Sequence, residues 1–277
     1  MGTTPDRTRG RVRTGGRHGM IPDMQLRRLV RLALALTLSM FALGQAAVVQ
    51  ATTPTLLLPD LTMLPPTDFK IEYANGRKLL RFTTTAVNIG AGPFQVVGYD
   101  PTDGNAALTD TLSVKQQIKR SDGTWVERAT TAKMQWAGDG HNHWHILGYQ
   151  KFKLLTLGAT ALRYTAKTGF CAFDSYLYTS TKPAYYTWEK TCRTLPNGTV
   201  FMGTSRNWGD VYKSNLAFQW IDITGLASGD YLLRVIADPP YGSPGQFRES
   251  NETNNRAWAK IHIGTTSVYV ISRSAKP

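Results

Sequence analysis

The chain of 277 residues has little cysteine, little acidic charge and few strong helix formers in its main part. Two cysteines are too few for a disulfide-dense extracellular scaffold. After residue 51, helix-forming residues are sparse whereas Thr, Tyr, Val and Gly are abundant, which favours β structure over a helical domain. A hydrophobic content of 42% with 10% aromatic residues excludes a disordered chain.

The shortage of acidic residues is unevenly distributed along the chain. There are 32 Lys plus Arg against 19 Asp plus Glu, and a net charge of +13 is typical of proteins that bind nucleic acids. Residues 1–51, however, hold eight arginines and two aspartates, a net charge of +6, which leaves +7 for the rest. Because we expect that first segment to be removed, we predict no nucleic-acid partner.

The longest apolar run, Leu29–Leu43, is too short for a membrane span, which needs roughly 20 apolar residues. It follows a pair of arginines and leads into small residues that end at Ala51, the order of a secretory signal. We therefore predict a signal segment over residues 1–51, with Met20 or Met24 as alternative starts. The mature chain is expected to be secreted or extracytoplasmic, without stable membrane insertion; an uncleaved anchor is the alternative.

Export determines what the two cysteines are expected to do. Outside the cytosol, Cys171 and Cys192 should form a disulfide. Closing a loop of about twenty residues would stabilise the fold by roughly 3 kcal/mol in the chain-entropy model. Neither cysteine lies in a Cys-x-x-Cys spacing, which disfavours a thiolate metal site.

Short alternating apolar stretches separated by Gly turns predict an all-β fold. We expect an extended entry segment, Leu56–Phe69, and a less regular stretch, Lys167–Asp210. The expected strands are Lys78–Val87, Phe94–Tyr99, Leu112–Ile118, Trp125–Ala129, His141–Leu155, Phe218–Ile223, Tyr231–Ala237 and Ala257–Ile263. No internal repeat or linker interrupts this series, so we predict a single β-sandwich domain over residues 52–277, with long irregular loops and little helix.

Three histidines alternate with other residues at His141, His143 and His145. On a strand of period two, their imidazoles point to one side, with Asn142 and Trp144 opposite. If the strand bends, metal–nitrogen bonds of about 2.0–2.1 Å let all three reach one ion. Imidazole suits zinc, copper, iron and nickel, so the row predicts a metal site without choosing the metal. A loosely binding histidine tract and a polar surface strand are the alternatives.

From this row onward the chain resembles the lysyl oxidase family, the copper- and quinone-dependent amine oxidases. The region Pro59–Gly92 resembles the bacterial-type members. Further blocks occur in family order: Lys167–Asp174, Tyr212 with Gln219–Thr224, Gly229–Val235 and Glu249–Asn255. The resemblance implies that His141, His143 and His145 hold copper. It also implies that Lys167 and Tyr212 form the lysine tyrosylquinone (LTQ) cofactor.

The resemblance further implies the activity of a protein-lysine 6-oxidase-like enzyme. Such an enzyme uses O2 to convert primary amines, either peptidyl lysine or small amines, to aldehydes, with hydrogen peroxide and ammonia as products. The stretch after Tyr212 is not acidic, so no catalytic base is carried over from the family. Asp174, Asp210 and Asp222 are the candidates.

The resemblance also implies a calcium site that joins the entry segment to the last hairpin. Its expected ligands are Asp60, the Leu61 carbonyl, Glu249, Asn251, Asn254 and Asn255. Ligands that are all oxygen atoms suit calcium. The same residues also fit an Asn-rich turn, because Asn and Asp are equally common in turns.

Two other function classes stay open at this point. One is a non-catalytic extracellular β-sandwich that serves as a binding or adhesion module, supported by the Asn88-Ile89-Gly90 turn and the Glu252–Asn255 ending. The other is a zinc hydrolase that uses three His ligands and keeps one metal position open. Neither class needs Lys167 together with Tyr212.

Overall fold

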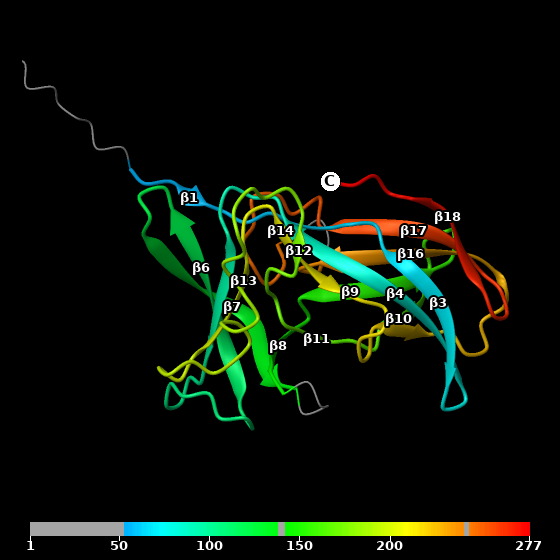
Figure 1. The fold of residues 1–277 in the computed structure, drawn as a ribbon, viewed down its shortest axis with the longest axis horizontal. Helices are drawn as coiled ribbons and strands as arrows, with labels where there is room; N and C mark the ends of the chain where they lie inside the picture. The colour runs from blue at the N-terminus through cyan, green and yellow to red at the C-terminus, as the bar shows by residue number, and fades with distance from the viewer. Residues whose placement is uncertain (1–52, 138–141, 241–243) are drawn as a thin grey trace, which may run out of the picture. The chain divides into compact units, whose positions relative to one another are not determined.

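The computed structural model describes residues 53–137, 142–240 and 244–277. Within these ranges the chain forms antiparallel β-sheets and no helix (Figure 1), so the predicted all-β class is confirmed. In the same ranges, no helix is long and apolar enough to cross a membrane. The predicted signal segment and His141 lie outside the described residues.

The strands of the described ranges make up three sheets. The first follows the order β11-β8-β7-β6-β5-β13, with β1 against β6; its strands are β1 Leu56–Leu57, β5 Phe94–Tyr99, β6 Thr111–Arg120, β7 Trp125–Trp136, β8 Trp144–Leu147, β11 Gly169–Phe170 and β13 Val200–Thr204. The second follows the order β10-β9-β16-β17-β18; its strands are β9 Gln150–Leu155, β10 Ala161–Tyr164, β16 Gly229–Ala237, β17 Arg256–Ile263 and β18 Val268–Arg273. In the third, β4 pairs with β2, β3, β14 and β15, and β14 pairs with β12; its strands are β2 Leu61–Met63, β3 Thr67–Ala74, β4 Arg77–Asn88, β12 Tyr176–Leu177, β14 Trp208–Tyr212 and β15 Trp220–Asp222.

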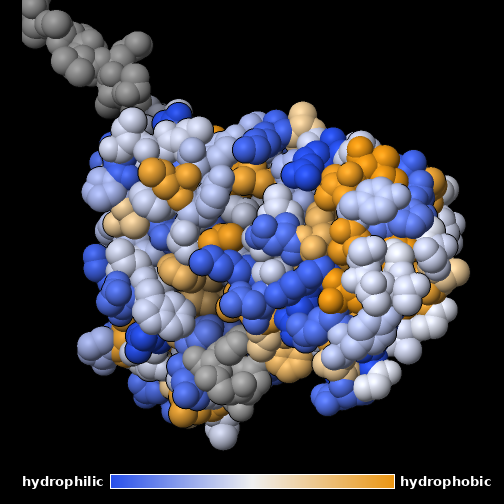
Figure 2. All heavy atoms as spheres, turned by 45° about the vertical axis from the view of Figure 1, so that its right-hand side comes forward, coloured by the Kyte–Doolittle hydropathy of each residue, from blue (hydrophilic) through white to orange (hydrophobic). Residues whose placement is uncertain are grey.

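Alternation of side chains explains why these segments become strands with one buried face. Along β6 and β17, every second residue is buried and the residues between are partly exposed. Such a pattern places the apolar residues on one face of the sheet. Figure 2 shows the surface on one side of the molecule, where hydrophilic side chains form a band between more hydrophobic areas.

A series of aromatic rings connects the sheets through the core. Phe82 of β4 contacts Phe152 of β9, with ring centroids 5.5 Å apart, so the second and third sheets face each other. Phe152 lies 6.0 Å from Phe170 of β11, which in turn lies 5.1 Å from Tyr212 of β14. Edge-to-face arrangements at such distances add to the stability that burial provides. The Tyr212 ring is therefore fixed by the core.

Three of the expected strands are wrong in their bounds. The strand expected over Trp125–Ala129 continues to Trp136 as β7. The predicted strand over 141–155 is split at Gly148, whose φ of +72° turns the chain between β8 and β9. Phe218 has a φ of +58° and lies before β15 instead of inside a strand. Strands β3, β10 and β18 were not predicted, and the Lys167–Asp210 stretch contains three short strands and the start of β14.

Candidate active site

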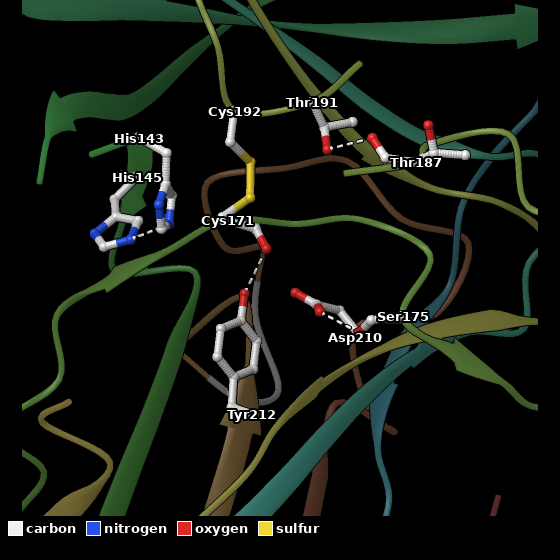
Figure 3. Close-up of a disulfide and its surroundings, with 9 residues drawn as sticks. All are labelled: His143, His145, Cys171, Ser175, Thr187, Thr191, Cys192, Asp210 and Tyr212. Atoms are coloured by element: carbon white, nitrogen blue, oxygen red, sulfur yellow. Dashed lines mark hydrogen bonds between the residues drawn. A yellow bond between two sulfur atoms is a disulfide. The ribbon is translucent and has the colours of Figure 1, made fainter. Parts of the chain in front are cut away.

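The two described histidines of the row face each other across a short gap. The Nε2 atoms of His143 and His145 are 2.9 Å apart, and their rings cross at 79° (Figure 3). Asn142 has a left-handed φ of +50°, and His143 precedes β8, so the row bends instead of continuing as a straight strand. Trp144 points to the opposite side, as predicted, and is fully buried in the core.

Space for the His145 ring depends on Gly169. Strand β11 pairs with β8, and Gly169 lies opposite Leu147, next to the histidine. A Cβ atom at Gly169 would come within 2.7 Å of His145 Nδ1. Only glycine leaves room for the imidazole here, because real Cβ atoms essentially never approach so closely. Gly169 therefore sets the position of one predicted metal ligand.

Lys167 and Tyr212, 45 positions apart in the sequence, are neighbours in the fold. Lys167 Nζ lies 5.4 Å from the centroid of the Tyr212 ring and 5.3 Å from that of Phe170. Both residues are buried, with 5% of Lys167 and 6% of Tyr212 exposed. The neighbouring Lys213 is exposed. Lys167 is therefore the amine that lies over the tyrosine ring.

The disulfide segment holds the Tyr212 hydroxyl. Cys171 and Cys192 form the predicted disulfide, with Cα atoms 5.8 Å apart. The Tyr212 hydroxyl donates a hydrogen bond of 2.7 Å to the Cys171 carbonyl oxygen (Figure 3). Burial raises the pKa of Tyr212 well above its usual value of 10.0, and the nearby Asp210 raises it further. The resting side chain is therefore a neutral phenol.

Of the three candidate base residues, only Asp210 lies in the site. The Asp174 carboxylate accepts hydrogen bonds from the backbone of Tyr185, Tyr186 and Ser205, and so supports a loop. Asp222 caps a turn by accepting hydrogen bonds from the backbone and hydroxyl of Thr224. Neither carboxylate lines the cavity described below.

Asp210 stands two residues before Tyr212 on β14 and is fully buried. Its Oδ1 atom accepts a 2.7 Å hydrogen bond from Ser175 Oγ, while no described residue donates a hydrogen bond to its buried Oδ2 atom. Burial raises the pKa of Asp210 to about 7, against the opposing effects of Tyr212, Ser175 and Lys167. Asp210 can therefore gain or lose a proton near neutral pH.

These groups line one cavity of about 380 Å³, which we call the central cavity. Its wall includes His143, His145, Lys167, Asp210 and Tyr212, with Lys213 and Leu216 nearer the surface. Sequence reasoning missed the aromatic part of the wall, where the Trp188 ring lies 5.0 Å from His143 and 5.6 Å from Phe173. Nothing in the spacing of Trp188 could have indicated this role, because the loop places it by long-range contacts.

The predicted calcium segment meets the entry segment through hydrogen bonds. Asn254 Nδ2 donates to Asp60 Oδ1 over 2.7 Å, and the backbone N–H of Leu61 donates to Glu249 Oε2. Asn255 Nδ2 donates to Glu249 Oε1 over 2.7 Å. Asn251 instead accepts hydrogen bonds from Thr253 within its own turn.

Two acidic residues that the sequence did not single out join this segment. Asp238, Glu249 and Glu252 each offer a carboxylate oxygen within 4.8 Å of the other two. Together with Asn254 and Asn255 we call them the acidic cluster. Burial raises the pKa of Glu249 well above its usual value and that of Asp238 to about 6. Three buried oxygens, on Glu252, Asn254 and Asn255, have no hydrogen-bond partner.

Comparison with known proteins gives one consistent result. The family model described as lysyl oxidase matches residues 100–272. Lysyl oxidase homolog 2 of Xenopus tropicalis is 32% identical over 157 residues, which are 56% of this chain and 18% of that protein. Lysyl oxidase homolog 2A of Danio rerio is 26% identical over 193 residues, 69% of this chain and 20% of that protein.

The chain thus spans about a fifth of the length of these relatives, and the similarity concerns one part of them. The matched region contains both described histidines, Lys167, Asp210 and Tyr212. The family match covers more than half of the chain and includes every described side chain of the central cavity named above, and on these grounds the chain belongs to the lysyl oxidase family.

Proposed function

We propose that the chain is a secreted copper- and quinone-dependent amine oxidase of lysyl oxidase type. The observation that carries this proposal is the distance of 5.4 Å between Lys167 Nζ and the Tyr212 ring, in the same cavity as His143 and His145. A buried amine beside a buried phenol and two imidazoles is the set of groups that formation of LTQ requires. The overall reaction would use water and O2 to convert a primary amine to an aldehyde, ammonia and hydrogen peroxide.

The two histidines fit copper by the type of ligand that they offer. Their Nε2 atoms are 2.9 Å apart, so both imidazoles converge on one point. Imidazole suits copper as well as zinc, iron and nickel, and the match to the lysyl oxidase family favours copper among them. His143 and His145 would hold the ion, with His141 as the third ligand.

Copper, when bound, would supply with O2 the oxidising chemistry for converting the Tyr212 ring to a quinone. Lys167 would bond to that ring, and the finished cofactor would oxidise amines. Lys167 must lose its proton before its nitrogen can form that bond. The hydrogen bond from Tyr212 to Cys171 holds the phenol in place. Phe173 and Trp188 form an apolar part of the cavity wall, and Phe170 packs against the Tyr212 ring.

Asp210 would accept protons at its Oδ2 atom. That oxygen is buried, accepts no hydrogen bond from a described residue and belongs to a carboxyl group with a pKa of about 7. A general base works best when its pKa lies near the working pH. Asp210 would take the proton from Lys167 during cofactor formation and the proton from the carbon next to the substrate nitrogen during turnover.

The acidic cluster would hold calcium. Oxygen ligands at a buried position suit this ion, and the cluster offers three carboxyl groups beside buried oxygens that have no partner. Of the predicted ligands, Glu249, Asn254 and Asn255 belong to the cluster, while Asp60 and the N–H of Leu61 form hydrogen bonds with it. Asn251 is engaged in its own turn. Calcium would stabilise the contact between the entry segment and the hairpin before β17.

The other two function classes give no reason for the central cavity. An adhesion module would not need a buried lysine beside a tyrosine ring, and a hydrolase with three His ligands would not use either residue. A disulfide is typical of oxidising compartments and supports an extracytoplasmic location. The proposed partners are a primary-amine substrate and O2.

The test is formation of the cofactor in copper-loaded, aerated protein. The protein should develop a visible quinone absorption and react with phenylhydrazine. The metal-free protein and the variant Tyr212→Phe should do neither. If the copper-loaded protein stays colourless and unreactive toward phenylhydrazine, the amine oxidase proposal is wrong. If Tyr212→Phe reacts as the wild type does, a different carbonyl group is present and the assignment of Tyr212 fails.

A further inference from the structure

Basic side chains gather around the central cavity on two sides. On one side, a groove of about 480 Å³ is lined by Lys151, Lys153, Arg234 and Arg256, and we call it the first groove. It shares Lys151 and Pro239 with a hollow of about 430 Å³. Lys167 lines that hollow as well as the central cavity, so the basic surface is continuous with the buried amine.

Among the described residues that line the first groove there is no carboxylate. Lys153 of β9 and Arg234 of β16 are direct cross-strand partners. Like charges placed directly opposite each other destabilise a sheet. In the described ranges, no carboxylate pairs with Lys151, Lys153 or Arg234, and the two lysines lie instead over the Tyr164 ring at 5.3 and 5.9 Å.

The pKa of Lys153 is lowered by burial as well as by the close approach of these positive charges. Burial lowers it from its usual value, and repulsion by Lys151 and Arg234 lowers it further. A negative group placed in the groove would relieve both the desolvation of these cations and their mutual repulsion. The first groove is therefore built for anionic groups.

On the other side of the cavity, a groove of about 620 Å³ shares Val211 and Lys213 with it, and we call it the second groove. Its basic residues are Lys70, Lys213, Arg273 and Lys276, and Asp68 is its one acidic residue. Lys213 thus places a positive charge at the entrance of the central cavity. An amine substrate, itself a cation in water, meets basic side chains in both grooves beside the cavity.

Repulsion of this kind selects against polycationic substrates and in favour of amines that carry their own negative charges. We infer that the substrate is a lysine in an acidic peptide segment, whose carboxylates bind the two grooves while the lysine side chain enters the central cavity. The inference rests on the proposed amine oxidase function. Because the grooves adjoin the cavity, the carboxylates lie within a few residues of the lysine, on both sides of it.

The first test compares three peptides of equal length that carry one lysine flanked by Glu, Gln or Arg residues. Peroxide release at low salt should give the highest kcat/KM for the Glu peptide and the lowest for the Arg peptide. We expect steps of about tenfold, mainly in KM, that shrink at high ionic strength because salt screens exposed charges. Equal values for the three peptides, or a preference for the Arg peptide, would overturn the inference.

The second test measures binding without catalysis. A Glu-flanked peptide with norleucine in place of lysine should bind the metal-free protein in a calorimetric titration. Lys153→Glu combined with Arg234→Glu should weaken this binding by about tenfold. Lys119→Glu combined with Lys133→Glu, on β6 and β7, changes the net charge equally and should leave it unchanged. If the charge reversal prevents folding, the milder pair Lys153→Gln with Arg234→Gln takes its place. It should also weaken binding, because it removes both positive charges.

The outcomes separate this inference from the proposed function. Binding of the norleucine peptide without any amine turnover would support the role of the grooves in binding acidic peptides and count against the proposed oxidase activity. Turnover of small amines without peptide binding would leave the oxidase in place and refute the substrate class. Binding of heparin or RNA, but not of the acidic peptide, would show that the grooves serve another polyanion, and the inference would be wrong.

Discussion

The central cavity and the acidic cluster are two buried polar regions built from different atoms. The cavity combines imidazole nitrogens, an amine and a phenol, and among its described lining residues the one carboxylate is the buried Asp210. The acidic cluster offers carboxylate and amide oxygens as ligands, and its three carboxyl groups each have an oxygen within 4.8 Å of the other two. Nitrogen ligands suit copper, and oxygen ligands suit calcium. If the proposed assignments hold, the fold would keep copper and calcium apart through the different ligand atoms that the two regions offer.

The largest expected effect is the loss of amine turnover in Tyr212→Phe, a variant that changes the central cavity and leaves the acidic cluster intact. Tyr212→Phe removes the oxygen from which a quinone must form, so amine turnover should fall by about 10³-fold or more. The variant also loses the hydrogen bond to the Cys171 carbonyl, which should cost about 1 kcal/mol of stability. Stabilisation by calcium should be unchanged in thermal unfolding. Loss of the calcium response in this variant would show that the two regions are coupled.

Asp210→Asn should lower kcat by about 10²-fold to 10⁴-fold, because it removes the proton acceptor but keeps the shape of the side chain. With a pKa of about 7, Asp210 is ionised above neutral pH, so wild-type kcat/KM should rise as the pH passes through about 7. The variant should lack this rise. Asp222→Asn, at a turn outside the cavity, is the matched control. An unchanged pH profile in Asp210→Asn would contradict the assignment.

Gly169→Ala should weaken copper binding by about 10-fold to 100-fold, the usual cost of disturbing a ligand through its neighbour. Its Cβ would displace the His145 ring, which it would otherwise approach within 2.7 Å. A titration with copper measures the loss. Gly158→Ala is the control, since the nearest atom to its Cβ is 3.7 Å away. Calcium binding should be the same in both variants, and equal copper affinities would refute the role of Gly169.

Calcium should stabilise the protein by about 2.7 kcal/mol at a concentration 100 times its Kd. The gain should be larger at pH 8 than at pH 5, because the carboxyl groups must lose their protons to bind the ion and Asp238 has a pKa of about 6. Glu249→Gln should abolish the gain and leave copper binding intact. Equal melting temperatures with calcium and with chelator at pH 8 would contradict the site.

The metal-free protein should show the opposite dependence on pH. The folded pKa values of Asp210 and Asp238, about 7 and about 6, are both raised above the usual value of 3.8. Their contribution to stability is fully present below pH 3.8 and is lost as the pH rises through 6 to 7. These two groups should therefore make the free energy of unfolding of the metal-free protein lower at pH 8 than at pH 5. Denaturant unfolding at the two pH values measures the difference.

Much of the fold follows from local patterns. Phe94–Tyr99 was predicted with its observed bounds, and β4, β6, β16 and β17 were placed within a few residues, because alternation of apolar residues is a local signal. The predicted strand over 141–155 is wrong because the turn at Gly148 follows from contacts with distant segments, including the hydrogen bond from its N–H to the Thr168 carbonyl.

The candidate site follows from the sequence only in part. Lys167 and Tyr212 were expected together by resemblance, and the fold brings them together because β11 pairs with β8 while β14 pairs with β4. The position of Asp210 could not be separated from those of Asp174 and Asp222 before burial was known. Asp238 and Trp188 were missed, since each reaches its site through a loop that carries no recognisable spacing.

The most direct measurement of the central claim is peptide mapping of the copper-loaded, aerated protein after reaction with phenylhydrazine. The account predicts one labelled species in which the peptides containing Lys167 and Tyr212 are covalently joined. In the metal-free control, the same two peptides should be found unlinked. A labelled species that joins Tyr212 to Lys213, or unmodified peptides for both Lys167 and Tyr212, would contradict it.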